Sequence, residues 1–225
     1  MPAKALIFDL DDTLMDTCGQ LVPEAHRQAC LAMQAAGLDV ALEALLKTRL
    51  QLIRSQPRAD IDQLLAAHYG CQDPAVPLAG HQTYFNPVFE HLEPFPGVPE
   101  LLAELHQQHR LYLVTSGYAE TQARKVAALN IGQWFEDIGY IPVQAQRGKQ
   151  TYFSELIRSQ DYHPQEVVVI GDRINNEIVA GNRLGCPTVW IRQGECAHIL
   201  PEGPEETPRF ITDSVLNLPH ILPHI

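Results

Sequence analysis

The chain has 225 residues, of which 45% are hydrophobic and 19% charged, the composition of an ordinary globular protein. Its formal net charge of −11 repels polyanions, and no cluster of Lys and Arg offsets this locally, so nucleic acid is not an expected partner. No stretch reaches the roughly 20 apolar residues needed to span a bilayer, and the N-terminal apolar run is broken at Asp9. We therefore expect no signal peptide and no membrane partner, and a cytoplasmic location.

Five short apolar runs are typical of buried parallel strands. They cover residues 4–8, 111–115, 137–141, 167–171 and 187–191, and a last strand and helix are expected near the C-terminus. Helical patterns separate them, at 99–109, 119–130, 151–160 and 176–185. Strands that alternate with helices predict an α/β fold with a Rossmann-like parallel sheet.

A long segment after the first strand breaks this alternation. We find helical patterns only, at 23–36, 41–55, 61–70 and 83–92, with separations at Gly37, around 56–57 and across 72–80. An all-helical block of this kind predicts a second, smaller domain. We therefore expect a core formed by residues 1–16 and 97–225, and a helical insertion over residues 17–96, with the chain returning to the core near residues 94–97.

The expected strands end in acids and hydroxyls, and a lysine begins a later helix. Parallel α/β sheets bind ligands at the carboxyl ends of their strands, so these side chains are expected to converge. They are Asp9, Asp11, Thr115, Ser116, Lys149, Asp172 and Glu177. A group of carboxylates without His or Cys favours Mg²⁺, and the cation together with Lys149 would suit a transferring phosphoryl group.

The two acids after the first strand have a natural division of labour. A carboxylate at Asp9 can act as a nucleophile and form an aspartyl-phosphate. The carboxyl group of Asp11 can protonate the leaving oxygen and later deprotonate the attacking water. Asp12, the third acid of the run, is expected to be a turn or capping residue.

The four elements, in this order, resemble the motifs of the haloacid dehalogenase-like superfamily. The elements are FDLDDTL at 8–14, TSG at 115–117, Lys149, and GD-x-x-x-x-E at 171–177. The helical block resembles the C1 cap of that superfamily's subfamily I. The resemblance implies that Asp9 is the nucleophile and Asp11 the general acid/base. It also implies that Thr115, Ser116 and Lys149 bind the phosphate.

The resemblance further implies a Mg²⁺ site. Its ligands would be Asp9, Asp11, Asp172 and a backbone carbonyl that we assign to Leu10, with support from Glu177. The chain departs from the common pattern at two positions. Gln150 replaces the Pro that often follows the lysine, and Glu177 is one methylene longer than the usual Asp.

These motifs favour a Mg²⁺-dependent phosphatase that acts on a small phosphorylated metabolite. A phosphomutase would use the same motifs and stays open as an alternative. A 2-haloacid dehalogenase is disfavoured because such enzymes lack an acid at the position of Asp11. A non-catalytic binding module would be expected to have lost one or more motifs. Side chains of the helical block (Arg49, Arg54, Arg58 and Tyr84) can contact substrate, but Arg on a helix is more often exposed, so we leave them out of the site.

Overall fold

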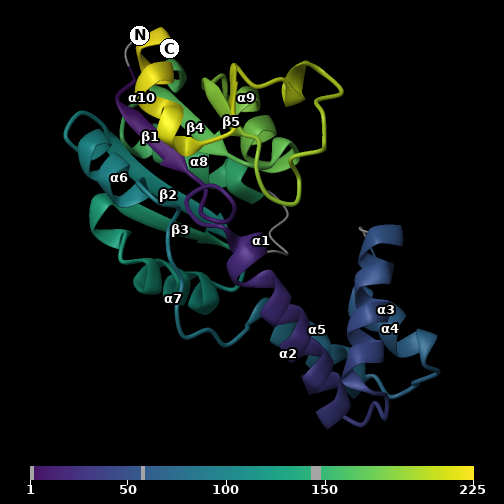
Figure 1. Cartoon of the computed structure of the whole chain (residues 1–225). Helices are drawn as coiled ribbons and strands as arrows, with labels where there is room; N and C mark the ends of the chain where they lie inside the picture. The colour runs from purple at the N-terminus through teal and green to yellow at the C-terminus, as the bar shows by residue number, and fades with distance from the viewer. Residues whose placement is uncertain (1–2, 57–58, 143–147) are drawn as a thin grey trace. The chain divides into compact units, whose positions relative to one another are not determined.

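The computed structural model describes residues 3–56, 59–142 and 148–225. Within them the chain forms one parallel six-stranded sheet in the order β3-β2-β1-β4-β5-β6 (Figure 1). The strands are β1 (Ala5–Phe8), β2 (Arg110–Ser116), β3 (Asp137–Ile141), β4 (Val167–Gly171), β5 (Thr188–Ile191) and β6 (Phe210–Thr212). The predicted α/β class and every predicted strand are confirmed.

Helices connect the strands across the two faces of the sheet. They are α6 (Val98–His106), α7 (Ala119–Leu129), α8 (Gly148–Ser159), α9 (Val179–Leu184) and α10 (Leu218–Ile221). A π-helical turn, η3 (Ile174–Ile178), precedes α9. Short 3₁₀ turns are η1 (Gly132–Trp134), η2 (Pro164–Glu166), η4 (Pro204–Glu206), η5 (Val215–Asn217) and η6 (Leu222–His224).

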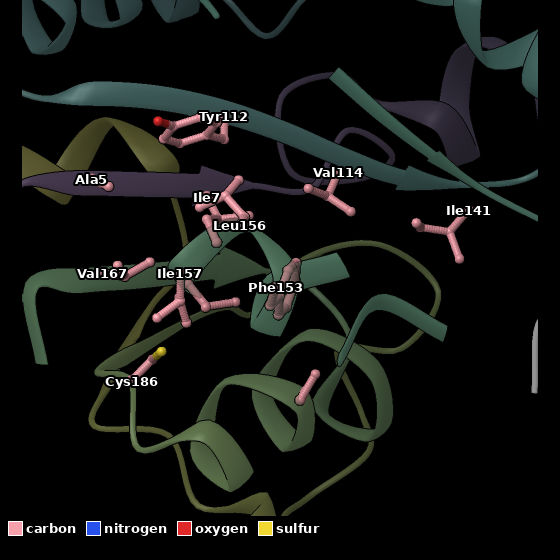
Figure 2. Close-up of a cluster of buried hydrophobic side chains, with 12 residues drawn as sticks. Ala5, Ile7, Tyr112, Val114, Ile141, Phe153, Leu156, Ile157, Val167 and Cys186 are labelled. Atoms are coloured by element: carbon pink, nitrogen blue, oxygen red, sulfur yellow. The ribbon is translucent and has the colours of Figure 1, made fainter. Parts of the chain in front are cut away.

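Alternate residues of the central strands build the core on one face of the sheet. Ala5 and Ile7 of β1 and Val114 of β2 pack with Phe153 and Ile157 of α8, as Figure 2 shows. Because neighbouring strand residues point to opposite faces, Leu6 and Phe8 are buried on the other side. The sheet is therefore covered on both faces, which explains the continuous apolar runs in the sequence.

The chain divides into two compact units, residues 1–18 with 91–225 and residues 19–90. The sequence predicts the inserted helical unit over residues 17–96, so the two sets of boundaries differ by a few residues. The second unit contains α2 (Val22–Ala35), α3 (Leu42–Ser55), α4 (Ile61–His68) and α5 (Ala75–Phe85), and α1 (Thr17–Gln20) crosses the boundary. Its core consists of Cys30, Met33, Leu38, Leu45, Leu65, Ala66 and Val76.

The last helix of this unit differs from the prediction. We expected a helix over 83–92 and a separation across 72–80, whereas α5 covers Ala75–Phe85. The helix follows Pro74 and contains Pro77 in its first turn, where proline is tolerated because its missing N–H has no intrahelical acceptor. The helix ends before Pro87, because the residue preceding a proline disfavours the α conformation.

A buried ion pair holds α3 and α4 together, which corrects the expectation that Arg49 is exposed. Arg49 is 1% exposed and its Nη1 donates to Asp62 at 2.5 Å. Its Nε donates to Nδ1 of His26 at 3.0 Å, and His26 stacks on Tyr84. Arg54 is exposed as expected, and Arg58 lies outside the described residues.

The cysteines fit the expectation of small buried hydrophobes only in part. Cys30 and Cys186 are buried, whereas Cys18, Cys71 and Cys196 are half-buried, and all five thiols are free. Across the described residues, the helices are all too short or too polar to cross a bilayer.

Candidate active site

The strand order places the end of β1 at the point where the chain reverses direction across the sheet. β1 lies between β2 and β4, and the N–H of Asp9 donates to the carbonyl of Ile170 at 2.9 Å. Doubly wound sheets bind ligands at such a switch point, outside the carboxyl ends of the strands. Asp9 after β1 and Asp172 after β4 therefore occupy the position where a ligand is expected.

A buried lysine joins two of the predicted acids. Lys149, in the first turn of α8, is 1% exposed. Its ammonium group donates to Oδ1 of Asp9, and to Oε1 of Glu177 at 2.5 Å. Burial alone would lower the pKa of Lys149, but the charges and hydrogen bonds of the two carboxylates raise it instead. Lys149 is therefore a permanently charged cation at this end of the sheet.

Glu177 lies in the π-helical turn, a type of distortion that is frequent at functional sites. Its Oε2 accepts the N–H of Arg173 at 3.1 Å, so both carboxylate oxygens have a partner. Gly171 makes room for this side chain, because a Cβ there would lie 2.5 Å from Cγ of Glu177. The Glu177 carboxylate therefore has a defined orientation beside Lys149.

Asp172 is a buried acid with an unsatisfied oxygen. Its side chain is 2% exposed, and Oδ1 has no hydrogen-bond partner among the residues that the structure describes. Its backbone carbonyl accepts the indole N–H of Trp190 at 2.7 Å, which fixes the loop after β4 to β5. The guanidinium group of Arg173 lies beside this carboxylate, with Nε 4.0 Å from Oδ2. A buried carboxylate oxygen without a donor is unusual and suits a cation as partner.

The pKa values of Asp9 and Asp172 are both raised, as expected for a site that binds a cation. Burial, followed by the charges of Asp9 and Glu177, raises the pKa of Asp172 to about 9. Burial also raises the pKa of Asp9 to about 7, against the opposing charge of Lys149. The carboxylates cannot all be ionised together without further positive charge. Hard oxygen donors in this arrangement fit Mg²⁺.

Asp11 belongs to a different set of contacts. Although its burial raises the pKa of Asp11, the charge and hydrogen bond of Lys125, with hydrogen bonds from Thr17 and Gln122, lower it overall. Lys125 Nζ lies 2.7 Å and Thr17 Oγ1 2.6 Å from Oδ1, and Gln122 Nε2 lies 2.9 Å from Oδ2. Oδ1 of Asp11 thus has two donors and Oδ2 has one, and the metal-ligand role of this side chain stays a prediction.

Thr115 and Ser116 end β2 beside the same glutamine. The hydroxyl of Thr115 is buried and accepts from Gln122 Nε2 at 2.7 Å, which leaves its own hydrogen free to be donated. The carbonyl of Ser116 lies 2.8 Å from the same nitrogen. The loop after β2 and the carboxylate of Asp11 are thus held by one side chain.

The prediction that the backbone carbonyl of Leu10 binds the metal ion does not agree with the structure. Its carbonyl oxygen accepts the N–H groups of Thr13 and Leu14, at 3.3 and 2.9 Å, and a carbonyl has two lone pairs. No lone pair of Leu10 remains for a metal ion. Asp12, by contrast, has the expected capping role: it adopts a left-handed φ of 53°, and its Oδ1 accepts the N–H of Cys18 in α1.

The sequence reasoning missed Lys125 and Gln122, which are both buried. Their signal is weak: two polar residues three positions apart on the helix that follows β2. That spacing puts both side chains on one face of α7, near its start. Lysine is nearly always exposed, so the residue type gave no reason to place Lys125 inside the protein.

The geometry can be compared with known proteins. The family model described as haloacid dehalogenase-like hydrolase matches residues 3–185. The chain belongs to this family. Glyceraldehyde 3-phosphate phosphatase of Methanopyrus kandleri is 32% identical over 93% of each chain. Human N-acylneuraminate-9-phosphatase is 25% identical over 99% of this chain and 94% of its own.

The fold is shared with solved members of the family. The HAD-hydrolase YfnB of Bacillus subtilis, whose crystal structure is bound to magnesium, superimposes with a TM-score of 0.68. It is 20% identical and covers 99% of both chains. The HAD-like chain described here is therefore a hydrolase, and its sheet and inserted helices are those of a family whose named relatives include phosphatases.

Proposed function

We propose that this chain is a Mg²⁺-dependent phosphatase that hydrolyses a small phosphomonoester through an aspartyl-phosphate on Asp9. The observation that carries the proposal is the pair of acids after β1, each with its own lysine. Asp9 pairs with Lys149, and Asp11 pairs with Lys125. Two carboxylates in separate electrostatic settings can take two roles, nucleophile and acid/base. A dehalogenase has no need of the second acid, because its leaving group is a halide.

Asp9 and Asp172 are the carboxylates that would bind a magnesium ion, and the charge of Glu177 acts on both of them. The unpartnered Oδ1 of Asp172 and the raised pKa values of Asp9 and Asp172 support this assignment. Bound Mg²⁺ would supply positive charge that favours the ionised carboxylates and offsets the charge of a phosphate group. Glu177, whose oxygens bind Lys149 and the N–H of Arg173, would orient Lys149 rather than bind the ion directly.

The reaction has two balanced steps. In the first, an oxygen of Asp9 attacks phosphorus, the bond from phosphorus to the ester oxygen breaks, and Asp11 gives its proton to that oxygen. In the second, a water attacks phosphorus, its proton passes to Asp11, and the bond to Asp9 breaks to release phosphate. The ammonium group of Lys149 and the hydroxyl of Thr115 would hold the phosphoryl oxygens. Because Lys125 lowers the pKa of Asp11, this carboxyl group has to take up a proton before the first step, and it regains that proton in the second. Asp9 starts and ends as a carboxylate.

The related phosphatases suggest where to look for the substrate. Glyceraldehyde 3-phosphate and a sugar-acid 9-phosphate are named for relatives that align with nearly the whole chain. We therefore place small phosphorylated aldehydes and sugars first among candidates, ahead of nucleotides. The inserted helical unit would act as the cap that excludes water during phosphoryl transfer.

The test is Mg²⁺-dependent release of phosphate from p-nitrophenyl phosphate, followed by a panel that begins with glyceraldehyde 3-phosphate. Asp9→Asn should abolish release, because an amide cannot form the intermediate. Asp39→Asn, the same change at an exposed acid of the helical unit, should leave it unchanged. Full activity of Asp9→Asn, or no activity of the wild-type protein with Mg²⁺, would overturn the proposal.

A further inference from the structure

The helix α7 carries a lysine whose position is unusual for its residue type. The side chain of Lys125 is 8% exposed, and its ammonium group lies 2.7 Å from Oδ1 of Asp11. Burying a lysine is unfavourable unless a partner compensates for lost hydration. The Asp11 carboxylate supplies that partner. Lys125 is thus a second buried lysine at the carboxyl end of the sheet, separate from Lys149.

The contacts around Asp11 fix both of its oxygens. Lys125 and the hydroxyl of Thr17 donate to Oδ1, and Gln122 donates to Oδ2. A carboxylate on a short turn can otherwise rotate about two side-chain bonds. Held by donors on both oxygens, it has one orientation.

Gln122 extends this arrangement to the loop after β2. Its Nε2 lies 2.7 Å from the hydroxyl oxygen of Thr115 and 2.9 Å from Oδ2 of Asp11. Gly117 leaves room for the glutamine, because a Cβ there would lie 3.0 Å from its Cγ and Nε2. One face of α7 therefore sets the distance between Asp11 and the hydroxyl expected to bind phosphate.

We infer that Lys125, with Gln122, is a positioning residue that holds the Asp11 carboxyl group in line with the phosphoryl group on Asp9. The inference rests on the proposed phosphatase function and adds residues outside the four motifs. Lys125 donates to Asp11 and acts through it. Misplacement of an acid/base group by about 1 Å can cost on the order of 10²-fold in rate, so the contact has a measurable consequence.

An aryl phosphate separates the two steps of the reaction. The p-nitrophenolate group leaves without a proton, so formation of the aspartyl-phosphate needs Asp11 little, whereas its hydrolysis needs Asp11 to take a proton from water. Lys125→Met should therefore lower kcat by about 10- to 100-fold, short of the loss expected from removing a general base altogether. KM should fall or stay unchanged, and stopped-flow traces should show a burst of one equivalent of p-nitrophenolate. Lys125→Arg, which keeps a donor, should recover part of the rate.

A double-mutant cycle shows whether Lys125 acts through Asp11. Lys125→Met should slow the wild-type protein but change Asp11→Asn by less than about 2-fold, because the positioned group is already gone. A crystal structure of Lys125→Met should show the Asp11 carboxylate rotated from its present contacts. Lys4→Met removes an exposed lysine that precedes β1, at the opposite end of the sheet, and is the matched control.

Two results would overturn the inference. One is an equal loss of rate from Lys125→Met in the wild-type and Asp11→Asn backgrounds. The other is a loss of rate without a burst, accompanied by a fall in the melting temperature, which would give Lys125 a structural role only. Failure of the phosphatase proposal is read separately, from Asp9→Asn and from the wild-type protein with and without Mg²⁺.

Discussion

The Lys149 ammonium group lies between Asp9 and Glu177 and so joins the end of β1 to the turn that follows β4. These segments are adjacent in the sheet, but Asp9 and Glu177 are 168 residues apart in the sequence. One side chain from α8 donates to both carboxylates, and so three elements of the core are joined through a single ammonium group. The first prediction tests this junction.

Replacement of Lys149 by Met should leave two buried carboxylates without a cation. Breaking a buried ion pair from one side typically costs about 3–5 kcal/mol in the free energy of unfolding. Catalysis should fall by about 10²–10³-fold, the effect of losing one charge-stabilising donor. Urea unfolding and phosphate release measure the two effects. Lys149→Met combined with Glu177→Gln should regain part of the stability but none of the activity; recovery of activity would show that Lys149 has no role beyond folding.

Substitution of Asp172 by Asn should have opposite effects on the protein with and without metal. Without Mg²⁺, the variant should be more stable than the wild type, because one of several mutually repelling carboxylates is gone. With Mg²⁺ at about 100 times its Kd, the wild type should gain roughly 2.7 kcal/mol, and the variant should gain far less. Thermal unfolding in EDTA and in excess MgCl₂ gives both comparisons. Equal stabilisation of the two proteins by Mg²⁺ would place the ion elsewhere.

Acid should weaken the helical unit through His26. Burial, followed by the charge of Arg49, lowers the pKa of His26 to about 4 from 6.5. Because the pKa of His26 is lower in the folded than in the unfolded state, neutral His26 contributes to the free energy of unfolding above pH 6.5. This contribution is lost as the pH falls from 6.5 towards 4. The total is at most about 3 kcal/mol. The groups that face His26 are Arg49 of α3, with its partner Asp62 of α4, and the ring of Tyr84 of α5.

Urea unfolding of the wild type between pH 7 and pH 4 measures this loss, and His26→Gln is the control. The glutamine oxygen can still accept from Arg49 but does not titrate. The free energy of unfolding of the wild type, relative to that of His26→Gln, should therefore fall as the pH falls. Parallel pH profiles for wild type and His26→Gln would contradict the prediction.

Gly171→Ala should displace Glu177 from Lys149. The added Cβ would lie 2.5 Å from Cγ and 2.8 Å from Cβ of Glu177, closer than real contacts allow. Overpacking of this kind costs about 1–3 kcal/mol, and activity should fall because Lys149 loses one of its two partners. Gly203→Ala is the matched control, since nothing lies within 4 Å of its Cβ and its φ is ordinary. Activity within about 2-fold of wild type in Gly171→Ala would show that Glu177 does not orient Lys149.

The strands of the sheet, and the acids that follow them, could be predicted from the sequence for a physical reason. Buried parallel strands are continuous apolar runs, and their ends are marked by residues that cannot be buried without a partner, such as Asp9 and Asp172. Lys149 and Glu177 followed from their spacing relative to these ends, and the structure brings Lys149 into contact with both Asp9 and Glu177.

Other features depended on tertiary contacts that a pattern does not contain. Arg49 and Lys125 have the residue type of surface side chains, and only the acids that face them, Asp62 and Asp11, explain their burial. The helix α5 begins earlier and ends earlier than the predicted helix over 83–92, and it accommodates Pro77 in its first turn. Leu10 was assigned a free carbonyl that the tight turn after β1 uses for its own hydrogen bonds.

The central position of β1 in the sheet determines how slowly its backbone amides exchange with solvent. Backbone amides of β1 are paired on both sides, with β2 and β4, and its four residues are completely buried or nearly so. Such amides exchange with solvent only when the whole domain unfolds. Asp9, whose own N–H bonds to β4, is thus attached to the most slowly exchanging part of the chain. Deuterium uptake at residues 5–9 should therefore report the global stability of this domain.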